Sequence, residues 1–320
     1  MKILKRIAIC IVVILSGLYI SGTIYSIQPP LVNRTITADT ARIKQDLYFL
    51  AKECRFRNYK HPGELQKASE YIYNEFKKVS DSVGVQKYNW ENYEFNNVIC
   101  SFGPRDAERI IIGAHYDACG DQEGADDNAS GTCGILELAR LLKDQPLKYR
   151  VDIVAYSTEE PPFFATNYMG SYVHAKSLHD ANIKVKGMIC LEMIGVYLDE
   201  KGSQDYPVFF LKWFYGNKGN FITVTQKNGN GNFGKFFRKR MKQEQVMPTK
   251  SFTVPQWVGG IDLSDHRNYW KFGYSAVMVT NTAFYRNKNY HTVDDTVDKI
   301  DIHRMSLVID EVYKTVLDIK

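Results

Sequence analysis

The sequence predicts an α/β fold, a single domain in which helices flank a mostly parallel, mixed central β-sheet. Apolar runs of strand length alternate with segments of helical periodicity, which is typical of such folds. No internal repeat or long Gly/Ser/Pro-rich linker divides the 320 residues, and 44% of them are hydrophobic. Polar motifs follow several of the apolar runs. Because ligands bind outside the carboxyl ends of the strands in such sheets, we expect these motifs to meet at one edge.

Six segments have the pattern of helices that cover a sheet. The first follows Asp39, a residue type that favours a helix start, and places Leu47 and Leu50 at helical spacing. In the second, Ile72 and Phe76 share one face. The expected helices are 38–51, 64–78, 130–142, 168–180, 234–245 and a C-terminal helix from residue 302.

Seven segments have the pattern of strands. The run Ile-Ile-Ile-Gly-Ala at 110–114 and the segment that leads to the adjacent Glu159 and Glu160 are short and apolar, as buried strands are. The expected strands are 85–93, 97–102, 110–114, 151–159, 185–192, 219–226 and 275–280.

The first 28 residues differ in kind from the rest. Lys2, Lys5 and Arg6 precede about 20 mostly apolar residues, long enough to span a bilayer as a helix. Ser21-Gly22-Thr23 also suits signal-peptide cleavage, so residues 1–28 are predicted to be a signal peptide or a transmembrane anchor. The leading positive charges predict that the remainder, 29–320, is periplasmic or secreted. A membrane is expected as a partner only through the N-terminal segment, if it is uncleaved.

The net charge and the cysteine spacing argue against a nucleic-acid-binding protein and against a zinc ribbon. The net charge of +5 includes the three cationic residues before the apolar segment, so the body is nearly balanced and nucleic acid is not an expected partner. Five cysteines follow residue 28, an odd number that permits at most two disulfides and matches no zinc-ribbon spacing. They fit two interpretations, small buried hydrophobic residues or a partly bridged set.

Histidines and carboxylates stand at the expected strand ends. Histidine nitrogen and carboxylate oxygen suit zinc, and a two-metal site needs one bridging carboxylate and two terminal ligands for each ion. The chain offers such a set, which is His115, Asp127, Glu160, Glu192 and His291. Glu159 then remains to deprotonate the attacking water and to protonate the leaving amine.

Six ordered motifs carry a resemblance to a known family. They are His115-Tyr116-Asp117, the segment Gly124–Gly131, Glu159-Glu160, the segment Leu191–Gly195, Ser264-Asp265-His266 and Tyr290-His291-Thr292. Together they resemble the motifs of the co-catalytic zinc aminopeptidases, which include the bacterial leucyl aminopeptidases and the related glutaminyl cyclases. The resemblance spans about residues 40 to 300.

The resemblance implies two zinc ions per chain, with other divalent metals as alternatives. His115 and Glu192 would be terminal ligands of one ion, Glu160 and His291 would be those of the other, and Asp127 would bridge them. Leucyl aminopeptidases commonly have aspartate where this chain has Glu192, a departure that bears on the geometry of one metal.

The resemblance also implies roles beyond metal binding. Glu159 would be the general base and acid. Asp117 would accept a hydrogen bond from the His115 ring, and Asp265 would support the ligands from behind, although it also suits a helix cap. Tyr290 is a candidate to stabilise the oxyanion.

The predicted function is a metallo-exopeptidase, an aminopeptidase that acts on peptides. Two alternatives are a glutaminyl cyclase, which forms N-terminal pyroglutamate, and a non-catalytic receptor-like domain. The aromatic segment 206–221 fits either a specificity pocket or ordinary core.

Overall fold

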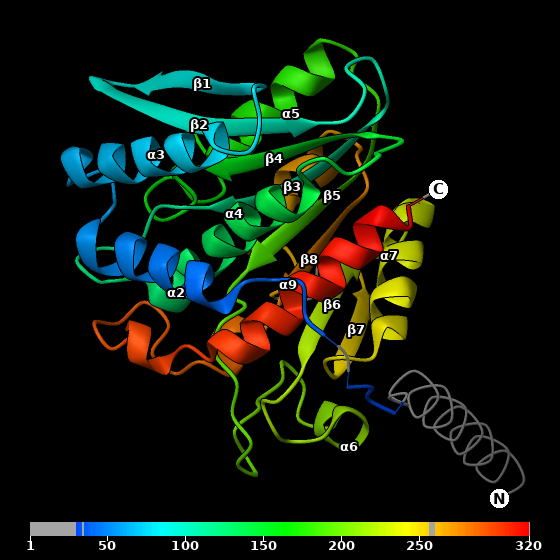
Figure 1. Ribbon diagram of the computed structural model, residues 1–320. Coiled ribbons are helices and arrows are strands. Elements are labelled where there is room, and N and C mark those ends of the chain that lie inside the picture. The colour runs from blue at the N-terminus through cyan, green and yellow to red at the C-terminus, as the bar shows by residue number, and fades with distance from the viewer. Residues whose placement is uncertain (1–29, 34, 256–259, 320) are drawn as a thin grey trace, which may run out of the picture.

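The computed structural model describes residues 30–33, 35–255 and 260–319, which form a single α/β domain around an eight-stranded mixed sheet (Figure 1). The strand order is β1-β2-β4-β3-β5-β8-β6-β7. The strands are β1 (Val83–Trp90), β2 (Tyr93–Phe102), β3 (Arg109–His115), β4 (Arg150–Tyr156), β5 (Val185–Glu192), β6 (Ile222–Lys227), β7 (Thr249–Val254) and β8 (Ala276–Thr280). The predicted fold class is confirmed.

Four parallel strands form the middle of the sheet. In register, Ile112 of β3 pairs with Ile153 of β4 on one side and with Ile189 of β5 on the other, and β5 pairs in parallel with β8. These strands are buried on both faces, which explains their nearly continuous apolar sequences. The outer strands β1, β2 and β6 run antiparallel to their inner neighbours. The four parallel carboxyl ends therefore share one edge.

Helices cover both faces of the sheet. On one face lie α2 (Thr40–Tyr48), α3 (Pro62–Lys77), α4 (Gly131–Leu142), α7 (Gly231–Glu244) and α9 (Ile302–Leu317), and on the other lie α5 (Gly170–Asp180) and α8 (His266–Lys271). Figure 1 shows α2, α3, α4 and α9 crossing in front of the sheet. The short elements are α6 (Leu211–Tyr215), π-helical turns at Phe49–Glu53 and Ala125–Ser130, and 3₁₀ turns at Ala283–Tyr285 and Val297–Lys299.

The sequence pattern placed most elements, but it missed α6 and failed at three further points. The end of the strand predicted at 151–159 was wrong, because β4 stops at Tyr156 and Thr158 adopts a positive φ of 60° that an extended strand does not allow. The edge strand β7 was missed because polar residues interrupt its apolar pattern. The helix α8, with six residues, is too short to show a helical period. Both glutamates therefore lie in a loop beyond β4.

The predictions for the N-terminus fall outside the structure. Residues 1–28 are not among the described residues, so the choice between signal peptide and anchor stays a prediction. Within 30–33, 35–255 and 260–319, no helix has the length and apolar character needed to cross a bilayer.

The five cysteines that follow residue 28 are all free thiols. Cys54, Cys100, Cys133 and Cys190 are buried, as small hydrophobic residues would be, whereas Cys119 is half-buried in the loop after β3.

Candidate functional site

The candidate residues come from strand ends and from the loops that follow them, and they converge at the carboxyl edge of the sheet. His115 is the last residue of β3 and Glu192 is the last residue of β5. Glu159 and Glu160 follow β4, and His291 lies in the long connection between β8 and α9. The expectation that separate motifs meet at one edge is therefore confirmed by their mutual distances.

Asp127 lies at the centre of the group. Its Oδ1 lies 3.4 Å from Nε2 of His115, and its Oδ2 lies 3.1 Å from Nε2 of His291. Asp295 accepts hydrogen bonds from the backbone nitrogens of Asp126 and Asp127 at 3.0 to 3.2 Å, which fixes this turn. One buried carboxylate thus faces two histidines with different oxygens.

The first half of the site surrounds His115. Its Nε2 lies 3.4 Å from Glu192 Oε2 and 3.9 Å from Glu159 Oε2. Glu192 Oε2 accepts a hydrogen bond of 2.6 Å from Ser264 Oγ, and Asn128 Nδ2 lies 3.3 Å away as a second donor. The extra methylene of Glu192 therefore still lets its carboxylate reach the histidine.

The second half surrounds His291. Its Nε2 lies 3.1 Å from Glu160 Oε2, and the Tyr290 ring stacks on the imidazole with centroids 3.8 Å apart. The Sγ of Cys119 belongs to the same group, since sulfur, a ring nitrogen and a Glu160 oxygen all lie within 4.8 Å of one another. The same limit holds for the ligand atoms of His115, Asp127 and Glu160, so Glu160 lies between the halves.

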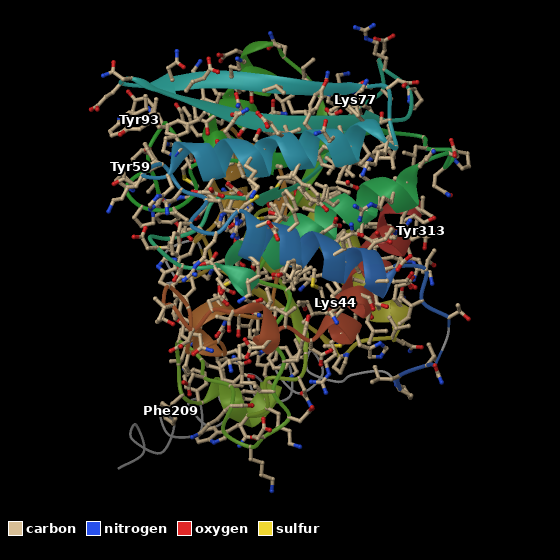
Figure 2. All side chains as sticks on the ribbon, turned by 60° about the vertical axis from the view of Figure 1, so that its left-hand side comes forward. Lys44, Tyr59, Lys77, Tyr93, Phe209 and Tyr313 are labelled. Atoms are coloured by element: carbon tan, nitrogen blue, oxygen red, sulfur yellow. The ribbon has the colours of Figure 1, made fainter. Side chains whose placement is uncertain are left out.

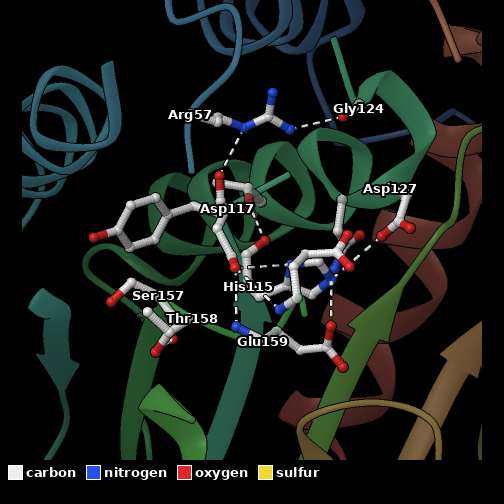
Figure 3. Close-up of polar contacts among 12 residues, drawn as sticks. Arg57, His115, Asp117, Gly124, Asp127, Ser157, Thr158 and Glu159 are labelled. Atoms are coloured by element: carbon white, nitrogen blue, oxygen red, sulfur yellow. Dashed lines mark hydrogen bonds and ion pairs between the residues drawn. The ribbon is translucent and has the colours of Figure 1, made fainter. Parts of the chain in front are cut away.

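Asp117 ties the loop after β3 to the loop after β4. Its Oδ1 lies 3.2 Å from Nδ1 of His115, and its two oxygens accept hydrogen bonds of 3.1 Å from the backbone nitrogens of Glu159 and Glu160 (Figure 3). Above it, the buried Arg57 donates to the carbonyl oxygens of Tyr116 and Gly124. The backbone around both glutamates is thereby held in place.

The electrostatics favour a bound cation. Burial and the carboxylates nearby raise the pKa of Glu159 and of Glu160 well above their usual range. Burial acts in the same direction on Asp127, but the two histidines outweigh it and hold the pKa of that carboxyl below its ordinary value. Within the described part of the chain, Glu160 Oε1 and His291 Nε2 are buried atoms without a hydrogen-bond partner. Buried carboxylate oxygens and imidazole nitrogens this close together fit divalent metal ions, which would neutralise the carboxylates.

Asp265 is buried immediately before α8. It occupies the N-cap position of α8, as the helix-cap interpretation expected, but its side chain makes no capping hydrogen bond. Neither of its carboxylate oxygens has a hydrogen-bond partner among the described residues, and burial raises its pKa to about 7. His115 and Glu192 interact with it electrostatically, so it lies near the first half of the site.

Sequence reasoning missed several residues that hold the candidate ligands. Asn128 accepts hydrogen bonds of 3.0 Å from the backbone nitrogens of Gly131 and Met193, and so joins the turn at Asp127 to the end of β5. Asp126 accepts from Asn281 and Asn287, at 2.8 and 3.0 Å. In the sequence, only the Asp-Asp-Asn motif hinted at the contacts of Asn128. No local pattern indicated those of Asp126 with Asn281 and Asn287.

An apolar cavity of about 240 Å³ opens beside the site. Glu192 and Tyr290 line it together with apolar side chains, which include Val208, Leu211, Phe252, Ile261, Leu263 and Met278. The aromatic segment divides between locations, because Tyr206 also lines the cavity whereas Phe209 and Trp213 are each 67% exposed. Figure 2 shows Phe209 at the end of the molecule opposite Lys77.

Comparison with other proteins finds relatives along most of the chain. It is 40% identical over 283 residues to "Uncharacterized protein YfbL" of Escherichia coli, a match that covers 86% of this chain and 87% of that protein. It is 27% identical over 275 residues to "Probable leucine aminopeptidase 1" of Trichophyton verrucosum, with 80% of this chain and 68% of that protein covered.

Solved structures share the fold. LapB from Legionella pneumophila matches with a TM-score of 0.69 at 21% identity, over 89% of this chain and 73% of that one. A glutaminyl cyclase from Porphyromonas gingivalis matches with a TM-score of 0.67 at 17% identity, over 87% and 98%. The sequence model of Peptidase family M28 matches residues 97–316. The chain therefore belongs to peptidase family M28.

Proposed function

We propose that the protein is a zinc-dependent aminopeptidase that removes N-terminal residues from peptides. The observation that carries the proposal is the position of Asp127, whose two oxygens face two histidines, one at the end of β3 and one in the loop before α9. Each histidine has its own second carboxylate, Glu192 beside His115 and Glu160 beside His291. Such a donor set would suit two metal ions, with Asp127 as the ligand they share.

The donor atoms favour zinc. Imidazole nitrogen and carboxylate oxygen are its usual ligands in catalytic sites. His115, Glu192 and Asp127 Oδ1 would hold one ion, and His291, Glu160 and Asp127 Oδ2 would hold the other. When bound, the metals would supply Lewis-acid polarisation of the scissile carbonyl and a lowered pKa of the attacking water.

Glu159 is the proton carrier in this proposal. Its Oε2 lies 3.9 Å from His115 Nε2, farther than the oxygens of Asp127 and Glu192 at 3.4 Å, and its pKa is raised by burial. A carboxyl group with a raised pKa can take the proton of the attacking water and return it to the leaving amine. The hydrogen bond from its own backbone nitrogen to Asp117 fixes the position from which it acts.

In this proposal Tyr290 stabilises the reacting carbonyl oxygen. Burial and the neighbouring carboxylates raise the pKa of its phenol, so the hydroxyl stays protonated and remains a hydrogen-bond donor. Tyr290 also lines the apolar cavity, in which the proposal places the substrate side chain.

The cavity supports peptides with a large apolar N-terminal residue as substrates. Its apolar walls suit a leucine, methionine or phenylalanine side chain, and Glu192 and Tyr290 mark the end at which the peptide bond would lie. The relative described as a probable leucine aminopeptidase is consistent with this choice.

The test is a substrate panel on the full-length protein with its metal content measured. Aminoacyl and dipeptide substrates with N-terminal leucine, methionine or phenylalanine should release free amino acids, faster than those with aspartate or lysine. A peptide with N-terminal glutamine is the second arm. Pyroglutamate formation without release of amino acids would contradict the proposal in favour of the cyclase, and no turnover in either arm would favour a receptor-like domain.

A matched pair of variants on α6 tests the pocket. Leu211 lines the cavity, whereas Trp213 on the same short helix is exposed and does not. Leu211→Asp should lower kcat/KM for leucine substrates by about 10-fold or more, since apolar contacts in a pocket are worth 1 to 3 kcal/mol, roughly. Trp213→Asp should leave kcat/KM unchanged. Equal effects from the two variants would remove the cavity from substrate recognition.

A further inference from the structure

We propose that Cys119 is a sulfur ligand of the metal ion in the His291 half of the site. The two metal positions would then differ in chemistry, with only nitrogen and oxygen donors at one and an added thiolate at the other. This inference rests on the metal site of the proposed function.

The first observation is the position of the thiol. Cys119 lies four residues after His115, on the same loop beyond β3. Its Sγ, a ring nitrogen of His291 and a carboxylate oxygen of Glu160 all lie within 4.8 Å of one another, close enough for one ion between them. The other cysteines that the structure describes are buried and belong to no such group.

The second observation concerns the atoms that face the thiol. The Glu160 side chain is only 4% exposed, and its Oε1 has no hydrogen-bond partner among the described residues. The same is true of His291 Nε2, although it lies 3.1 Å from two carboxylate oxygens. Buried polar atoms are rarely left without partners, so these atoms and the nearby sulfur point to a shared ligand.

The two halves of the site differ in their softest donor. Around His115 the nearest donor atoms are carboxylate oxygens, from Asp127, Glu192 and Glu159. A thiolate is a soft ligand that favours zinc and related thiophilic metals over magnesium or manganese. We therefore expect zinc, cobalt and cadmium to fill the His291 half first.

Cobalt spectroscopy on the full-length protein tests the ligand directly. Protein stripped of metal under reducing conditions is titrated with Co²⁺, and the near-ultraviolet sulfur-to-cobalt charge-transfer absorption is followed. Wild type should show this band, complete at one ion per chain. Cys119→Ser and Cys119→Ala should lack it, and the matched control Cys100→Ala, a change at a buried thiol in β2, should keep it.

The outcomes separate this inference from the proposed function. Two bound Co²⁺ ions without a sulfur band would overturn the role of Cys119 and leave the aminopeptidase site intact. A band that persists in Cys119→Ser would overturn it as well, because another thiol would then be the ligand. A protein that binds no metal at all would overturn both proposals.

Metal affinity gives an independent measurement. A serine can still hydrogen-bond to the His291 ring but does not replace a thiolate, so Cys119→Ser should weaken one zinc site by at least the ~10- to 100-fold that loss of an outer partner costs. Full zinc affinity in the serine variant would reduce Cys119 to a hydrogen-bonding neighbour and contradict the proposal.

Discussion

The two halves of the site present similar donor atoms but are built differently. The His115 side chain is 1% exposed, on the end of a central strand whose register is set by pairing on both sides. The His291 side chain is 28% exposed, in a loop where its backbone adopts a positive φ of 57°. The position of His115 is therefore set by the strand pairing of the sheet, whereas the position of His291 depends on the contacts that hold its loop.

Contacts between distant segments hold that loop. Asn287, four residues before His291, donates a hydrogen bond to Asp126 at 3.0 Å, and Asp126 precedes the residue that faces both histidines. Stacking of Tyr290 on His291 orients the ring itself. A strand end thus places a ligand through the backbone, whereas a loop places one through side-chain contacts, and the two should differ in their sensitivity to mutation.

The largest expected effect on activity comes from substituting each of the two adjacent glutamates separately. Glu159→Gln should lower kcat by about 10²- to 10⁴-fold, the usual contribution of a general acid or base, with both metals retained. Glu160→Gln should instead lose the ion of the His291 half. Activity assays with metal analysis on both variants check this. Normal turnover in Glu159→Gln would rule out its role as the proton carrier.

Replacing each histidine tests directly whether the two halves of the site differ in how much they stabilise the fold. His115→Ala removes an imidazole that can carry a positive charge among several buried carboxylates. Loss of one partner in such a buried ionic group costs about 3 kcal/mol of unfolding free energy. His291→Ala removes a partner of Asp127 and Glu160 and a ring stacking worth about 1 kcal/mol, but from a side chain that is 28% exposed, so its loss of unfolding free energy should be smaller. Denaturant titration of the metal-free proteins measures both. Equal losses of unfolding free energy in the two variants would show that both histidines contribute equally to the stability of the fold.

A smaller effect is expected from Ser264, which supports only the first half. Its hydroxyl donates a hydrogen bond of 2.6 Å to Glu192. Ser264→Ala should therefore lower the metal affinity of one site by ~10- to 100-fold, as loss of a hydrogen bond to a metal ligand does. The other site should bind metal as before. Calorimetric titration of metal-free protein resolves the two sites, and equal weakening of both would mean that Glu192 is not confined to the His115 half.

The smallest effect on the site is expected from Glu311, a buried carboxyl whose hydrogen bonds go to residues 246 to 249 and not to the candidate ligands. Glu311 on α9 accepts hydrogen bonds from the backbone nitrogens of Val246 and Met247, and burial raises its pKa from the ordinary 4.5 to about 8. Below pH 4.5 this group is protonated in the folded and the unfolded chain alike. Between pH 4.5 and 8 the unfolded chain loses the proton while the folded chain keeps it, so the unfolding free energy falls as the pH rises.

Glu311→Gln should remove this dependence. Relative to the variant, wild type should lose a few kcal/mol between pH 4.5 and 8, since ~1.4 kcal/mol accompanies each tenfold change in proton affinity. Unfolding titrations across this pH range measure the difference, and metal content should not change. Parallel curves for the two proteins would mean that Glu311 is ionised in the folded state.

The sequence by itself determined the fold class and the candidate ligands. Buried parallel strands need continuous apolar runs, and the polar residues that follow these runs must come out at one edge, so His115 and Glu192 were visible from local pattern alone. Local pattern failed where the apolar signal was weak, as at β7, or where one backbone angle ended a strand early, as at Thr158.

Only the tertiary structure decided how the candidate residues face one another. The contacts that place Asp127, Glu192 and His291 join segments far apart in the chain, such as Asp295 with the turn at Asp126 or Ser264 with Glu192. No local propensity encodes such pairs, because each depends on the packing of the whole sheet and its loops. The same packing brings the Cys119 thiol beside His291, a placement that residue spacing alone did not indicate.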